Sequence, residues 1–321
     1  MKKESSFSYA KYGYLFSIPF VLVYLIFHFY PTIYTAILGF TDCKGAGNTN
    51  WHFLTSDIFK NFRSVLTNKT FIQSLKNTVF LWIINFIPQI SLALLLTAWF
   101  TSHRNKLKGQ GFFKVVFYMP NIITAAAIAV LFNALFAYPI GPVNTIIQSL
   151  GIVKEPFYFT NKALASQLII AFIQFWMWYG YTMIILISGV LGISPELFEA
   201  AEIDGANSTQ VFFKITLPNL KTILLYTFIT SMIGGLNMYD IPKMFNNGNP
   251  ANSTLTANVF IYNQAFTGSY MYNRAAAASM IMFIIIAILS AFVFLLFRDK
   301  DEAAQKQSKK RLKKAMSKGV A

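Results

Sequence analysis

The segment Glu199-Ala200-Ala201-Glu202-Ile203-Asp204-Gly205-Ala206, followed by Leu217-Pro218, decides how this chain is interpreted. It carries several acidic side chains, but it lies between residues 163–193 and 222–239, which contain no charged side chain. Charge-free stretches of this length can cross a bilayer as helices. The acidic segment is therefore expected to be a short amphipathic connection between two membrane spans.

The composition of the whole chain indicates a membrane protein. Of the 321 residues, 55% are hydrophobic and only 12% are charged, and the mean hydropathy is +0.49. Soluble domains carry about twice this share of charged residues. The basic residues lie in short loops and tails between apolar runs, so membrane topology explains the net charge of +15 better than nucleic-acid binding does.

We therefore predict an all-α fold, that of a polytopic membrane protein with six transmembrane helices. The fifth span is expected to be interrupted at Gly234-Gly235 and closed by Asn237 and Asp240, and the first loop, residues 42–76, has room for a short helix. The predicted spans are residues 13–35, 77–100, 115–136, 166–189, 220–239 and 275–297. The predicted organisation is a cytoplasmic N-terminal segment 1–12, a six-span region 13–298 and a basic cytoplasmic tail 299–321.

The orientation follows from the basic residues, which are enriched in cytoplasmic loops of membrane proteins. With the N-terminus in the cytoplasm, most of the 27 lysines and arginines fall on the cytoplasmic side. These are the ones in residues 2–11, 104–114, 214–221 and 298–318. Both termini and the acidic segment are then cytoplasmic, and the tail is expected to contact anionic lipid headgroups rather than nucleic acid.

The acidic segment has the local signals of a helix–turn–helix. Ser194 can cap a first helix that begins at Pro195, and Gly205 permits the left-handed turn that ends it. A second helix is expected near Ser208, with Val211, Phe212 and Ile215 on one face. Composition alone would also fit an interfacial helix that anchors the loop.

The ordered set of residue types resembles the signature of the binding-protein-dependent ABC importer permeases. In that family the segment is a cytoplasmic coupling helix between spans four and five, which sits in a cleft of the ATP-hydrolysing subunit. The resemblance implies that Glu199 meets a basic residue there and that Gly205 gives the turn; Thr222 replaces a proline common in the family. The resemblance to the family runs from about residue 12 to 297, and the core transmembrane domain that it implies covers about 70–297. The matching residues are Glu199, Ala200, Ala201, Asp204, Gly205, Ala206, Ile215, Leu217 and Pro218.

Residues 237–279 resemble the carbohydrate permeases, and those of the maltose-type first membrane subunit most. The similar stretches are Asn237-Met238-Tyr239-Asp240, Asn247-Gly248-Asn249-Pro250, Ser253-Thr254 and Ile261-Tyr262-Asn263-Gln264-Ala265-Phe266. Asn249 replaces a glycine common in the family, and Asn77 and Gly141-Pro142-Val143-Asn144 fit it as well. This resemblance implies a sugar substrate.

A sugar is recognised by hydrogen bonds to its hydroxyls and by aromatic faces. Asn237 and Asp240 are the strongest candidates, because polar groups at the end of a span are costly unless they are used. Asp240 could equally be a surface residue at the outer boundary, and most aromatic residues of such a chain pack in the core or at the membrane interface. The further candidates are Tyr239, Gln174, Trp178, Trp176, Tyr179 and Tyr181.

The sequence has no phosphate-binding loop and no credible catalytic triad or carboxylate pair. Cys43 is the only cysteine, and His28, His52 and His103 follow no ligand spacing, so we predict neither an enzyme nor a metal site. No cofactor is expected in this chain, and the resemblance implies that a partner ATPase binds ATP and Mg.

We therefore expect the permease subunit of an ATP-driven sugar importer in a bacterial cytoplasmic membrane, which provides half of the translocation path and one coupling helix. Its implied partners are a second permease, an ABC ATPase dimer and an extracytoplasmic solute-binding protein. The alternatives are an ion-coupled secondary transporter of a small polar solute, disfavoured because no acidic residue lies mid-span, and a membrane scaffold protein.

Overall fold

The computed structural model describes residues 10–102, 108–268 and 270–297. Most of the predicted N-terminal segment and the whole predicted tail 299–321 lie outside these residues. The described residues form helices and loops, with only an isolated bridge between Thr41 and Phe53, which confirms the all-α prediction. The described residues divide into two compact units, one formed by residues 10–69 with those of 261–283, the other by those of 70–260 with 284–297.

Within the described residues, the helices long and apolar enough to cross a membrane number five, or up to six if a bent pair of helices counts as one span. The pair consists of residues 110–122 and 125–135. The predicted six spans are recovered in this sense, with boundaries that extend further than the apolar runs. The continuous spans are Lys11–Leu38, Lys69–Phe100, Ala163–Leu191, Lys221–Asn246 and Tyr272–Phe297.

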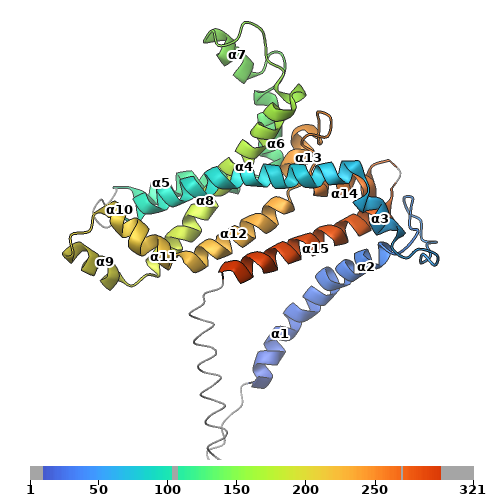
Figure 1. The fold of residues 1–321 in the computed structure, drawn as a ribbon, viewed down its shortest axis with the longest axis horizontal. Helices are drawn as coiled ribbons and strands as arrows, with labels where there is room; N and C mark the ends of the chain where they lie inside the picture. Colours follow the sequence, from blue (N-terminus) through green and yellow to red (C-terminus); the bar gives the residue numbers. More distant parts are fainter. Residues whose placement is uncertain (1–9, 103–107, 269, 298–321) are drawn as a thin grey trace, which may run out of the picture. The chain divides into compact units, whose positions relative to one another are not determined.

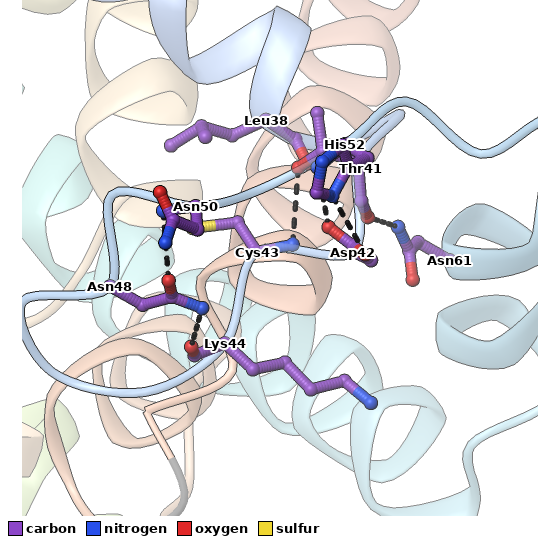
Figure 2. Close-up of polar contacts among 9 residues, drawn as sticks. All are labelled: Leu38, Thr41, Asp42, Cys43, Lys44, Asn48, Asn50, His52 and Asn61. Atoms are coloured by element: carbon purple, nitrogen blue, oxygen red, sulfur yellow. Dashed lines mark hydrogen bonds and ion pairs between the residues drawn. The ribbon is translucent and has the colours of Figure 1, made fainter.

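The first unit begins with a helix in three parts, α1 (Ala10–Tyr24), the π-helical turn η1 (Leu25–Phe29) and α2 (Tyr30–Leu38). The loop after it contains the expected short helix, α3 (Lys60–Leu66). Asn61 of α3 is buried, and its Nδ2 donates to the carbonyls of Gly39 (2.9 Å) and Thr41 (2.8 Å). Figure 2 shows Asn61 beside Thr41, where it fixes the start of the loop.

The second unit is built on two long helices, α4 (Lys69–Phe100) and α8 (Ala163–Leu191). They share an apolar cluster in which Ala93, Leu96 and Phe100 of α4 meet Met183 and Leu186 of α8. A second cluster joins α8 to α6 (Ala125–Leu135) and α13 (Asp240–Asn246). Small residues allow close approach: a Cβ on Gly180 would lie 2.1 Å from the Phe117 carbonyl oxygen.

The predicted span 115–136 is wrong as a single helix. α5 (Gln110–Tyr118) continues into the 3-10 turn η2 (Met119–Ile122), and α6 begins only at Ala125, at an angle of 87°. Figure 1 shows α6 turning away from the line of α5. Ile123 and Thr124 are extended, and the Thr124 hydroxyl accepts a hydrogen bond from Ala127 N (3.4 Å), so Thr124 caps a new helix instead of continuing the old one.

A loop with its own short helices follows α6: α7 (Pro142–Ser149) and the 3-10 turn η3 (Phe159–Asn161). The fully buried Asn144 fixes it, since its Nδ2 donates to the carbonyls of Ala137 (3.2 Å) and Phe157 (3.1 Å) and its Oδ1 accepts from Phe157 N (2.8 Å). This is the asparagine of the predicted Gly141–Asn144 motif.

The fifth span ends where the sequence indicated but is not interrupted at its glycines. α12 (Lys221–Leu236) continues through Gly234 and Gly235, which corrects the prediction. A Cβ on Gly235 would lie 2.1 Å from Trp82 Cδ1, so this glycine lets α12 pack on α4 instead of breaking the helix. After a break at 237–239, α13 and α14 (Ala257–Phe266) lead to α15 (Tyr272–Phe297).

Candidate functional site

The acidic segment, defined as residues 194–218, folds as the predicted helix–turn–helix. Its elements are α9 (Pro195–Ile203), α10 (Ser208–Val211), the π turn η4 (Phe212–Thr216) and α11 (Leu217–Asn219). Gly205 has a φ of +73°, a left-handed conformation that favours glycine.

The capping residues differ from the prediction. Ser194 stands at the N-cap of α9, but its side chain makes no capping hydrogen bond, so that detail was wrong. The strong cap is at α10, where Asn207 Oδ1 accepts from Gln210 N and Gln210 Oε1 accepts from Asn207 N, both at 2.8 Å. This reciprocal pair was visible in the sequence as Asn207 three residues before Gln210.

One face of the acidic segment is anchored in the second unit. Phe198 of α9 is buried in a cluster with Val190 of α8 and Leu220, and Val211 and Ile215 pack against the same cluster. Because Val190 belongs to the end of α8 and Leu220 directly precedes α12, the segment is joined to both helices.

The opposite face of α9 is open. Glu199, Ala200 and Asp204 are exposed, whereas Ala201 is buried beneath them. Ile203 is 87% exposed, which is unusual for an isoleucine beside three acidic residues. Sequence reasoning missed Ile203, although it lies inside the acidic run. The exposed surface of α9 thus combines acidic groups with large apolar side chains, Ile203 and the less exposed Leu197.

A cavity of about 290 Å³ lies in the second unit, between α4, α8, α12 and the residues after α12. It brings together all five residues predicted for the substrate path, Gln174, Trp178, Asn237, Tyr239 and Asp240. Tyr181, a further candidate, also lines it.

Two other aromatic candidates, Trp176 and Tyr179, do not line the cavity. They pack in the apolar clusters of α8 instead. Asp240, for which two interpretations were open, is exposed in the first turn of α13 and lines the cavity.

Sequence reasoning missed several polar residues of the wall. They come from inside apolar helices and share a helical spacing of three or four residues, which could have identified them. Gln89 Nε2 donates to Thr182 Oγ1 (2.8 Å), and Asn85 Nδ2 donates to the Leu81 carbonyl of its own helix (2.8 Å). The missed polar residues are Asn85, Gln89, Thr182, Thr227, Thr230 and Ser231.

The wall combines hydroxyls, amides and aromatic rings with little charge. Among the described residues that line it, Asp240 is the only charged one. The buried Thr227 hydroxyl has no hydrogen-bond partner within the described part of the chain. In the same part of the chain, no three His, Cys, Asp or Glu side chains come close enough to hold a metal ion.

Residues 74–300 match the family described as binding-protein-dependent transport system inner membrane component. The chain belongs to this family. It is therefore a multi-pass transport permease of the cytoplasmic membrane, as predicted.

The permease is similar to named relatives along most of its length. It is 32% identical to the lactose transport system permease protein LacF of Rhizobium radiobacter, over 90% of this chain and 94% of the relative. It is 30% identical to the multiple sugar-binding transport system permease protein MsmF of Streptococcus mutans serotype c, over 87% and 92%. Its fold matches a bacterial ABC transporter involved in the import of the acidic polysaccharide alginate, with a TM-score of 0.73, 21% identity and coverage of 90% and 96%.

Proposed function

We propose that this permease is the transmembrane subunit of an ATP-driven importer of neutral sugars, and that it provides half of the translocation path. The observation that carries the proposal is the cavity, whose wall offers amides, hydroxyls and aromatic faces in a charge-poor setting. The relatives LacF, a lactose transport permease, and MsmF, a multiple sugar-binding transport permease, support the same substrate class.

The composition of the wall favours neutral over acidic sugars. An acidic saccharide such as alginate would require a basic side chain for its carboxylates. The described residues that line the cavity include no lysine or arginine, and the one charge they do carry, on Asp240, would repel an anion. The proposal therefore limits the likeness to the alginate importer to the fold.

The acidic segment is proposed to be the coupling element. Its exposed face pairs acidic groups with Ile203, a combination suited to a cleft that has basic and apolar walls on a partner ATPase. ATP and Mg would be bound by that partner. ATP-driven closure of the ATPase dimer would displace α9, and the shared cluster with α8 and α12 would pass the displacement to two walls of the cavity, which gives alternating access.

The proposed assembly contains this chain, a second permease, an ATPase dimer and an extracytoplasmic binding protein that delivers the sugar. Both termini and the acidic segment would face the cytoplasm, with the basic tail against anionic lipid headgroups.

Co-purification from the native host in mild detergent tests the proposal. We expect an ATPase, a second permease and a binding protein in stoichiometric amounts. After reconstitution into liposomes, radiolabelled lactose or raffinose should be taken up in an ATP-dependent manner, and alginate oligosaccharide should not. Uptake driven by an ion gradient by the solitary chain would instead support a secondary transporter, and uptake of the acidic saccharide alone would overturn the neutral-sugar assignment.

A further inference from the structure

The cavity wall contains one stretch of backbone outside any helix, residues 237–239. α12 ends at Leu236 and α13 begins at Asp240, and all three residues between them line the cavity. Backbone groups outside a helix need other partners when they lie within a membrane protein. The partners found here determine where the side chains of Asn237 and Tyr239 are held.

Two of the carbonyls in this stretch are bound by side chains at the start of α14. Thr256 Oγ1 donates to the Met238 carbonyl at 2.8 Å, and Asn258 Nδ2 donates to the Asn237 carbonyl at 2.8 Å. The Thr256 side chain is fully buried, and its oxygen also accepts from Val259 N at 3.4 Å. The two donors thus fix consecutive peptide groups of the wall.

The start of α14 is itself fixed to α4. The Thr78 hydroxyl accepts from Ala257 N at 2.9 Å, and Asn77 Nδ2 donates to the carbonyls of Asn252 (2.7 Å) and Leu255 (3.1 Å). Thr78 is almost completely buried and Asn77 is 8% exposed, so these bonds are shielded from water and are correspondingly strong. A continuous path of buried hydrogen bonds therefore joins α4 to the cavity wall.

We propose that Thr256 and Asn258 are positioning residues for the solute path, which hold the 237–238 backbone so that Asn237 and Tyr239 face the passing solute. Neither residue lines the cavity, so both act through the stretch that they bind. The inference rests on the proposed function, because it takes the cavity to be part of the path of the transported solute. The hydrogen-bond path itself is independent of which solute is carried.

The first test measures the position of the backbone without a substrate. Hydrogen–deuterium exchange of the peptide that covers 237–241 is compared in the assembled transporter for wild type, Thr256→Val and Thr256→Ser. Faster exchange is expected in the valine variant, with the wild-type rate restored by serine. Thr97→Val is the matched control, since Thr97 is equally buried but donates to the Ala93 carbonyl of its own helix (2.7 Å) and, at 3.5 Å, to the Met183 carbonyl of α8, neither of which belongs to residues 237–241. Asn258→Ala serves as the second variant if Thr256→Val fails to assemble.

The second test measures transport of radiolabelled lactose and raffinose by the same variants in liposomes. Sugar taken up per ATP hydrolysed should fall roughly tenfold in Thr256→Val, the effect of losing one buried hydrogen bond. The concentration of loaded binding protein that gives half-maximal ATP hydrolysis should stay unchanged, because docking does not use the cavity. A merely structural role would change both the uptake per ATP and the half-maximal concentration of binding protein, or neither of them.

The outcomes separate the two proposals. Unchanged exchange at 237–241 in both Thr256→Val and Asn258→Ala would overturn the positioning role whichever solute is carried. Altered exchange with unchanged uptake per ATP would also overturn it. If exchange is altered in the variants but the wild-type transporter moves neither sugar, the hydrogen-bond path remains supported. The neutral-sugar function is then rejected instead.

Discussion

At the scale of single residues, Cys43 gives a pH-dependent probe of the first loop. Its side chain is 5% exposed; burial, and then the neighbouring Asp42 carboxylate, raise the pKa of its thiol above the ordinary value. Figure 2 shows the polar contacts of this part of the loop: Cys43 N donates to Thr41 Oγ1 at 3.3 Å, and His52 N donates to Asp42 Oδ1 at 2.7 Å.

Because only the thiolate reacts readily, Cys43 should be alkylated by iodoacetamide slowly at neutral pH, with a rate that rises at higher pH than for an ordinary cysteine. A raised folded-state pKa also means that the folded loop loses stability as the pH rises above the thiol pKa of the unfolded chain. The alkylation rate is measured from pH 7 to 11. The control is the double variant with Cys43→Ser and Thr49→Cys, whose only cysteine lies at an exposed position of the same loop. Equal profiles for the two proteins would contradict the prediction.

At the scale of elements, helix packing in the second unit depends on glycines whose neighbours differ. A Cβ on Gly180 would meet backbone atoms of Phe117 and Tyr118 in α5, which cannot rotate away, whereas a Cβ on Gly234 meets nothing within 4 Å. Gly180→Ala should therefore destabilise the permease by about 1–3 kcal/mol. Gly234→Ala should be neutral or stabilising by up to about 1 kcal/mol, because alanine favours a helix. Thermal unfolding in detergent checks both, and a lower Tm for Gly234→Ala than for Gly180→Ala would refute the packing argument.

At the scale of the whole molecule, the acidic segment is predicted to matter for assembly and not for the fold. Glu199→Lys reverses an exposed charge, and Gly205→Pro requires a negative φ where the chain has +73°. Both variants should insert normally, but the ATPase should no longer co-purify with them. ATP-driven uptake should fall at least about tenfold, the effect expected when an interfacial contact is lost. Glu155→Lys, the same change at an exposed site after α7, is the control. Normal assembly and uptake in both variants would reject the coupling role.

Some properties were accessible from the sequence because they depend on local chemistry. Charge is costly in lipid wherever it occurs, so the charge-free runs located the membrane-crossing segments and placed the acidic segment between two of them. The helix–turn–helix followed from Pro195 and Gly205, whose backbone preferences are intrinsic. The residues after α12 were found as cavity residues because polar groups at a span end are rare.

Other properties were decided only by the tertiary structure. In a uniformly apolar helix the sequence carries little contrast between faces, so nothing local shows which side meets a neighbouring helix and which side meets a cavity. Asn85 and Gln89 of α4 acquire their role only because α8 and α12 pack around them, and Gly235 stays helical because Trp82 fills the space beside it. The sequence by itself determined which segments enter the membrane, because each charged residue that enters lipid adds its own energetic cost. The cavity, and the hydrogen bonds that hold its wall, were decided by contacts between residues far apart in the chain.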